Sequence, residues 1–118
     1  MNILVTLNAN YLGPLTTMLT SLFLNNPDER FTIHLMHSSI DDGALERLGG
    51  YIARHGSELA VIRVDEEAFA DAPVLMHYTK EMYYRLLAHR FLPPEVDRIL
   101  YLDPDILVLN AVRPLYET

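Results

Sequence analysis

The chain has 118 residues, enough for one domain with a single core, and half of its residues are hydrophobic, which excludes a disordered chain. Its 9 basic and 16 acidic residues give a net charge of -7 without any lysine–arginine cluster, which argues against nucleic-acid binding. The absence of cysteine excludes disulfides and thiolate metal sites. We therefore expect one acidic domain over residues 1–118, with a charge balance that suits a bound cation.

The first ten residues, MNILVTLNAN, lack the basic region and the long apolar run of a signal peptide. No stretch of the sequence approaches the roughly 20 apolar residues that are needed to cross a bilayer. We therefore expect no transmembrane segment and a cytoplasmic location.

The first half of the chain alternates segments with strand and helix patterns. Apolar runs predict strands at 2–7, 31–37 and 58–64. Apolar residues at helical spacing predict one helix after the first strand, ending at 25–27, and another after the second strand, closed by Gly56. Their inward-facing residues are Leu15, Met18, Leu19 and Leu22 in the first helix and Leu45, Leu48 and Ile52 in the second.

The second half continues this alternation. It contains an acidic loop or short helix at 65–76, a helix at 79–92, a strand at 98–102 and a short fifth strand at 106–110. Strands that alternate with helices predict an α/β fold, with a mostly parallel sheet and helices on both faces. The sequence stops soon after the last strand, so we expect an open sheet edge and a truncated protein, or a half that needs a partner.

Two carboxylates interrupt the most hydrophobic stretch, RILYLDPDILVLN at 98–110. Asp103 and Asp105 flank Pro104, and residues two apart on a strand point to the same side, so both carboxylates can aim at one point. Such a pair repels unless a cation separates the charges, and Mg²⁺ and Mn²⁺ accept oxygen ligands of this kind. A β-turn explains the same residues, because Asp-Pro-Asp is a good turn sequence, and local chemistry alone slightly favours the turn.

Other nucleotide-binding motifs are absent from the sequence. The first strand leads into NANYLGP rather than G-x-G-x-x-G, and no G-x-x-x-x-G-K-[ST] occurs anywhere. These absences count against a dinucleotide-dependent dehydrogenase and against a P-loop enzyme.

Three segments occur in a recognisable order: TLNANYLGPLTTMLTSL at 6–22, MYYRLLAHRFLP at 82–93 and RILYLDPDILVLN at 98–110. Together they resemble the nucleotide-sugar half of the family-8 glycosyltransferases, retaining enzymes that include lipopolysaccharide galactosyl- and glucosyltransferases and glycogenin. The resemblance covers essentially the whole chain. It implies a GT-A type fold, a UDP-sugar donor, a divalent cation (Mn²⁺, or Mg²⁺) and retaining transfer of a hexose to a glycan or lipopolysaccharide acceptor.

The resemblance also implies roles for individual residues around the D-x-D motif. Asp103 and Asp105 would bind the metal, Asp103 would also reach the ribose, and Pro104 would lie beside the donor. Arg85 would sit near the phosphates or the sugar, a task that suits its bidentate guanidinium. A solvated Arg85 that pairs with Glu81 is the alternative.

The turn after the first strand would hold the uridine. Asn8, Asn10 and Tyr11 match this part of the family, and Tyr11 would stack on the uracil. An aromatic residue packed on the core at the start of a helix is an equally good explanation of Tyr11. Asn8 stands where relatives can carry an aspartate, and its amide oxygen can still accept a hydrogen bond from the base.

Family members are about twice this length or more, and their second half supplies a third protein ligand to the metal and the acceptor pocket. Retaining transfer in this family has no agreed nucleophile, so we assign no catalytic residue. Three hypotheses remain: a glycosyltransferase domain, a binding module that is catalytically incomplete, and a structural α/β domain in which DPD is only a turn. A homo-oligomer or a missing C-terminal half could complete the first.

Overall fold

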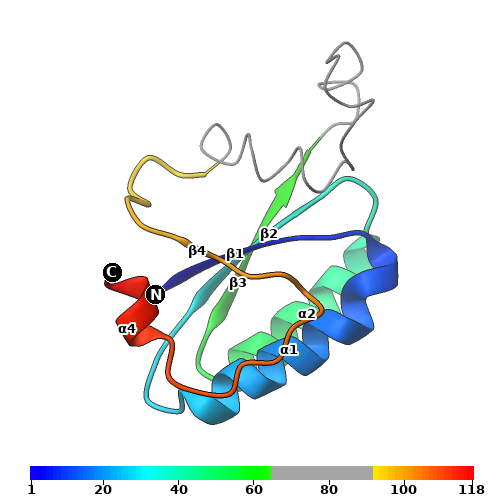
Figure 1. Cartoon of the computed structure of the whole chain (residues 1–118). Helices are drawn as coiled ribbons and strands as arrows, with labels where there is room; N and C mark the ends of the chain where they lie inside the picture. The colour runs from blue at the N-terminus through cyan, green and yellow to red at the C-terminus, as the bar shows by residue number, and fades with distance from the viewer. Residues whose placement is uncertain (65–91) are drawn as a thin grey trace, which may run out of the picture.

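The structure is a computed structural model, and it describes residues 1–64 and 92–118. The helix predicted at 79–92 and the loop before it lie outside the described residues, apart from Leu92. The elements, which Figure 1 shows in chain order, are β1 (Asn2–Thr6), η1 (Ala9–Tyr11), α1 (Leu12–Asn25), β2 (Thr32–His37), α2 (Asp42–Arg54), β3 (Glu58–Arg63), β4 (Leu100–Tyr101) and α4 (Arg113–Tyr116).

The described strands form one parallel sheet in the order β3-β2-β1-β4. β1 pairs with β2 in a register that aligns Leu4 with His34, and on its other side with β4 in a register that aligns Leu4 with Tyr101. From β1 the chain steps through β2 to β3 in one direction, whereas β4 is added on the opposite side of β1. The sheet confirms the parallel α/β fold that the alternation of strands and helices predicted.

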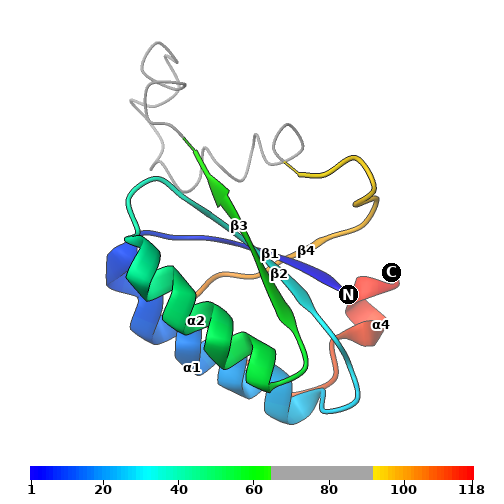
Figure 2. The same ribbon diagram turned by 180° about the vertical axis from the view of Figure 1, so that it is seen from behind.

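The helices α1 and α2 lie on the same face of this sheet, as Figures 1 and 2 show from opposite sides. On that face the side chains of Ile3, Val5 and Leu7 pack against the helices. The buried helical residues are Leu15, Met18, Leu19, Leu22 and Phe23 of α1 and Leu45, Leu48 and Ile52 of α2. Every inward-facing helical residue named from the sequence is therefore in the core.

A smaller apolar cluster lies on the other face of the sheet. Leu4, Met36 and Val64 are buried there, and Ile99 and Tyr101 pack against them. β1 therefore buries apolar side chains on both faces, which explains why its sequence is a continuous apolar run rather than an alternating one.

Gly56 follows the end of α2, as the sequence predicted. Gly56 has a φ of 76°, a left-handed conformation that glycine adopts without steric cost. The N–H of Gly56 donates to the carbonyl of Ala53, and the N–H of Ser57 donates to that of Ile52. These bonds satisfy the last carbonyls of the helix and turn the chain into β3.

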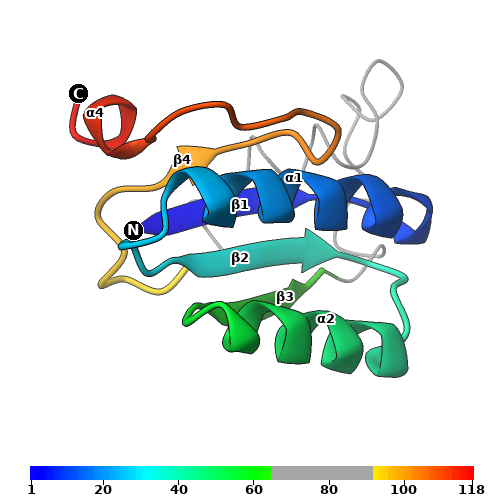
Figure 3. The same cartoon turned by 90° about the horizontal axis from the view of Figure 1, so that it is seen from below.

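The fifth strand predicted at 106–110 is wrong. This segment pairs with no strand among the described residues, and it runs beside α1 instead, as Figure 3 shows. Within 106–110 only Val108 is buried, whereas Ile106, Leu107 and Leu109 are exposed. A continuous apolar run in the sequence suggests a strand, but it does not show which groups satisfy the backbone hydrogen bonds.

The backbone of this segment is held by polar side chains near the end of α1, which we call the α1 clamp: Ser21, Asn25 and Asn26. The N–H of Val108 donates to Ser21 Oγ at 2.8 Å, and Asn25 Nδ2 donates to the carbonyl of Val108 at 2.8 Å. Asn26 Oδ1 accepts from the N–H of Val112 at 2.9 Å. The asparagines that end α1 therefore also hold a segment more than eighty residues later in the chain.

The short helix α4, which the sequence patterns did not predict, lies near the start of β1. The Tyr116 hydroxyl accepts from the N–H of Asn2 at 3.2 Å and donates to the carbonyl of Arg98 at 3.0 Å. Arg113 also pairs with Glu29 on the turn before β2. Within the two described ranges, no helix is both long enough and apolar enough to span a bilayer.

The α1 clamp yields a stability prediction. Asn26 is 4% exposed, and Asn26→Ala would leave the buried N–H of Val112 without its acceptor. We expect a loss of about 1–3 kcal/mol in the free energy of unfolding, measured by urea denaturation. The control is Asn25→Ala, because Asn25 is exposed and its loss should cost less. Equal midpoints for Asn26→Ala and the wild type would show that the clamp does not stabilise the fold.

Two buried histidines of β2 predict a pH dependence of stability. Burial lowers the pKa of His34 and of His37; the charge of Glu58 opposes this for His34, whereas for His37 Arg63 adds to it and Asp42 opposes it. His34 Nε2 donates to Asn2 Oδ1, and His37 Nδ1 accepts from the N–H of Ile40, so each bond is compatible with a neutral ring.

Because the folded state disfavours the imidazolium form, the unfolded chain binds more protons as the pH falls below its histidine pKa of about 6.5. The free energy of unfolding should therefore be highest above that pH and decline below it. Urea denaturation at about pH 7.5 and about pH 5.5 checks this, with nuclear magnetic resonance titration of both imidazoles. Histidine pKa values at or above those of the unfolded chain would contradict it.

Candidate functional site

The strand order brings the sequence-predicted site residues to one place in the sheet. The order reverses at β1, because β2 and β4 lie on its opposite sides. In open α/β sheets, ligands bind beyond the carboxyl ends of the strands at such a reversal. Asn8, Asn10 and Tyr11 follow β1, and Asp103 and Asp105 follow β4. The two segments therefore leave adjacent parallel strands at the same end of the sheet, where both strands have their carboxyl ends.

The hydrogen bonds between β1 and β4 determine where the segment with Asp103 leaves the sheet. The N–H of Leu102 donates to the carbonyl of Leu4 at 3.1 Å, so β1 and β4 stay paired up to the residue before Asp103. Just below this point Thr6 Oγ1 and the Tyr101 hydroxyl form a 3.2 Å hydrogen bond across the two strands. The sequence did not identify Thr6 and Tyr101 as a pair, since their juxtaposition depends on the register between strands that are 95 residues apart.

The turn after β1 is built around Asn8. Its Oδ1 accepts from the N–H of Asn10 at 2.9 Å, which caps the 3-10 helix η1 and fixes the backbone before α1.

Tyr11 is 43% exposed and is not part of the core clusters. Of the two interpretations of Tyr11, an aromatic ring that is accessible for stacking agrees better with this exposure than one packed on the core.

The Asp-Pro-Asp segment is a turn and not an extended strand. β4 ends at Tyr101, and Pro104 and Asp105 lie in a turn. The argument that both carboxylates share the same face of a strand is therefore wrong, because proline and the turn end the strand before Asp103. Asp103 and Asp105 are nevertheless exposed, while Pro104 is buried.

The described residues do not contain a complete set of protein ligands for a metal ion. In residues 1–64 and 92–118, no group of three or more histidine, cysteine, aspartate or glutamate side chains could hold a metal ion. Two exposed carboxylates are hard oxygen donors, which fit Mn²⁺ or Mg²⁺ when a substrate phosphate and water supply further ligands. Arg85, the other predicted donor-binding residue, lies outside the described residues.

The sequence matches a known protein family over almost its whole length. The sequence profile described as "Glycosyl transferase family 8" matches residues 2–118. The chain belongs to glycosyl transferase family 8. This confirms the resemblance that was recognised from the three motif segments.

Two lipopolysaccharide enzymes are among the relatives of this family 8 chain. Lipopolysaccharide 1,2-glucosyltransferase of Escherichia coli (strain K12) is 25% identical over 115 residues, which are 98% of the chain and 34% of the enzyme. Lipopolysaccharide 1,3-galactosyltransferase of Salmonella typhimurium is 23% identical over 116 residues, with the same coverage of 98% and 34%. The chain thus spans about a third of the length of these relatives.

A solved structure has the same fold. The galactosyltransferase LgtC, crystallised with donor and acceptor sugar analogues, superposes with a TM-score of 0.84 and 27% identity. The match covers 100% of this family 8 chain and 42% of LgtC. The expected GT-A type α/β fold is confirmed.

Proposed function

We propose that this family 8 chain binds a UDP-sugar, together with a divalent cation, for retaining transfer of a hexose to a glycan or lipopolysaccharide acceptor. The observation that carries the proposal is the strand reversal at β1, which brings the Asn8–Tyr11 turn and the Asp103–Asp105 turn to the same edge of the sheet. Membership of glycosyl transferase family 8 and the fold of a sugar-transferring enzyme support it.

Each of the two turns would bind a different part of the donor. Asn8, Asn10 and Tyr11 would hold the uridine, with the exposed ring of Tyr11 stacked on the base. Asp103 and Asp105 would hold Mn²⁺ or Mg²⁺, and Asp103 would also reach the ribose. When bound, such a cation supplies a Lewis acid that offsets the charge of the diphosphate leaving group.

Other protein groups would act from outside these two turns. Arg85 would neutralise the phosphates or orient the sugar, and Pro104, buried between the two aspartates, would fix the turn that presents them. The lipopolysaccharide relatives suggest glucose or galactose as the transferred sugar. We further propose that residues 1–118 form a single nucleotide-sugar-binding domain in the cytoplasm.

A second candidate is a nucleotide-sugar-binding module that is catalytically incomplete. One observation favours it: residues 1–64 and 92–118 contain no group of three or more histidine, cysteine, aspartate or glutamate side chains that could hold a metal ion. Such a module would bind donor without transferring sugar, and a homo-oligomer or a further polypeptide would have to supply the remaining groups.

Calorimetric titration of UDP with Mn²⁺ and then with excess chelator tests the proposal. We expect binding that requires the cation and that weakens about 10- to 100-fold in Asp105→Asn, since a lost charged ligand costs about 1.5–3 kcal/mol. The matched control is Asp28→Asn, which removes an exposed carboxylate from the turn between α1 and β2 and should bind UDP like the wild type.

The outcomes separate the candidates. UDP binding that is unchanged by the chelator and by Asp105→Asn would overturn the cation-dependent donor site, and no UDP binding in the presence of Mn²⁺ would favour a purely structural domain. Cation-dependent binding without transfer from UDP-glucose or UDP-galactose to a lipopolysaccharide acceptor would establish the incomplete module.

A further inference from the structure

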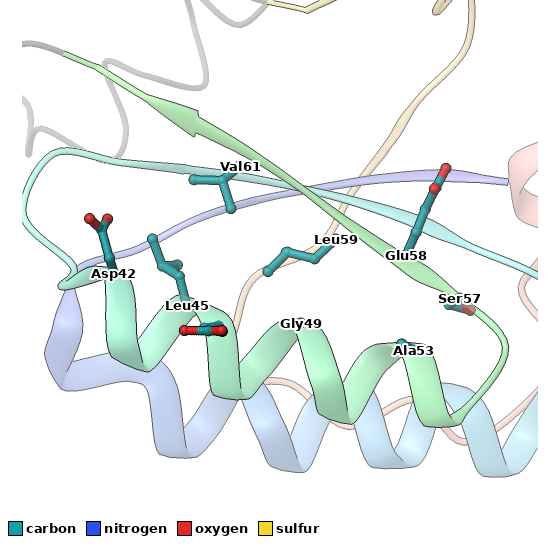
Figure 4. A pocket seen from close by; sticks show the side chains of 9 residues that line it. Asp42, Leu45, Gly49, Ala53, Ser57, Glu58, Leu59 and Val61 are labelled. Atoms are coloured by element: carbon teal, nitrogen blue, oxygen red, sulfur yellow. The ribbon is translucent and has the colours of Figure 1, made fainter.

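A groove follows the outer edge of β3, at the opposite side of the sheet from β4. It has a volume of about 490 Å³ and is lined by residues of α2 and β3, which Figure 4 shows from close by. Two strands, β2 and β1, separate it from the Asp103–Asp105 turn. The groove is therefore independent of the proposed donor site.

The backbone of β3 has unpaired groups along this groove. In the described sheet β3 pairs only with β2, and the N–H groups of Glu58 and Val64 both donate to carbonyls on that side. In a parallel ladder, the backbone groups of alternate residues point the same way, so Ala60 and Ile62 also face β2. The N–H and carbonyl groups of Leu59, Val61 and Arg63 consequently face the open edge.

The groove is apolar at its floor. Leu59 and Val61 lie on the face that is covered by α2, and Val61 is 43% exposed although it is a strand valine. Opposite them α2 presents the small residues Gly49 and Ala53, which leave the space that Figure 4 shows between helix and strand. A Cβ at position 49 would lie 3.7 Å from Leu59 Cδ2, so larger side chains at this position would extend into the groove.

The charges along the groove are mainly acidic. Asp42 and Glu46 project from α2 near the end of β3, and Glu58 stands at its start and points away from α2 in Figure 4. Asp42 and Glu46 therefore flank the open edge on the face of α2. On the other face the Glu58 carboxylate accepts from Thr32 Oγ1 of β2 at 3.1 Å, and Arg63 adds a positive charge at the end of β3. A segment with basic residues at its ends and on the far face would match the acidic side chains.

We propose that the β3 edge binds an extended segment of a partner protein, which adds to the sheet as a further strand and carries lysine or arginine around a short apolar centre. Main-chain hydrogen bonds to Leu59, Val61 and Arg63 would provide affinity, as in other cases of strand addition. Two apolar side chains would enter the groove over Gly49, and the basic residues would meet Asp42, Glu46 and Glu58.

Charge argues against a second copy of this chain as the occupant. The chain carries a net charge of -7, and two copies joined through β3 would bring their acidic groove residues together. Edge strands also use charged side chains to prevent pairing. Prevention of strand pairing would explain why β3 carries the charged residues Glu58 and Arg63, but it would not explain the apolar groove beside them.

Hydrogen exchange of the free chain is the first test. The amides of Leu59, Val61 and Arg63 should exchange fast, while those of Ala60 and Ile62, which point to β2, should be protected. Protection of all five amides would show that another part of the chain, or a second copy, already covers the edge, and it would overturn the proposal.

The second test uses the peptide Ac-Lys-Lys-Val-Lys-Val-Lys-Lys-NH₂, whose two valines share a face with the terminal lysines. Its binding to the ¹⁵N-labelled chain should shift and protect the three outward amides. The control peptide Ac-Glu-Glu-Val-Glu-Val-Glu-Glu-NH₂ should not bind. Equal affinity for the two peptides, no binding of the lysine peptide, or shifts confined to other strands would overturn the proposal.

Variants of the chain locate the contact. Val61→Pro removes one outward N–H without touching the β2 ladder and should weaken the lysine peptide about tenfold, whereas Val61→Thr keeps that donor and should weaken the peptide less than Val61→Pro does. Gly49→Leu fills the groove and should also weaken binding. If Val61→Pro unfolds, Gly49→Leu and the double variant Asp42→Asn, Glu46→Gln decide the outcome, and wild-type affinity in both would overturn the proposal.

Discussion

The position of β1 between β2 and β4 is the constraint on which the rest of the structure depends. β1 pairs with β2 along its whole length and with β4 at Ile3 and Leu4, and its apolar side chains are buried on both faces of the sheet. The same arrangement fixes where the chain emerges after β1 and after β4. The Asn8 turn and the aspartate turn are adjacent for this topological reason, whatever ligand they hold.

Much of this fold follows from local sequence patterns. The apolar run of β1, the helical spacing in α1 and α2 and the glycine after α2 each reflect interactions within a few residues, so the sequence predicted them correctly. The segment at 106–110 was predicted wrongly because its backbone bonds go to Ser21 and Asn25, whose proximity no local pattern reveals. Helix α4 likewise depends on contacts of Tyr116 with Asn2 and Arg98, and four residues are too few for a periodic signal.

The candidate site was likewise predicted correctly in some respects and wrongly in others. Sequence motifs identified Asp103, Asp105, Asn8, Asn10 and Tyr11, and the topology accounts for their meeting at one edge. The geometry proposed for the two carboxylates was wrong, because proline ends β4 earlier than the apolar run suggests. The order of residue types along the chain thus predicted which residues lie near one another, whereas the local backbone that presents them depends on where each strand ends.

The α1 clamp has a consequence for how the chain folds during synthesis. The unit from β1 to β3 is assembled from neighbouring elements, but β4 and the clamped segment reach β1 and α1 across more than eighty residues. Contacts between residues so far apart in the sequence form late, because the long loop between them must lose conformational entropy before the contacts can form. Until residues 100–112 leave the ribosome, the side of β1 that pairs with β4 remains open, and the nascent chain is exposed to aggregation at this strand.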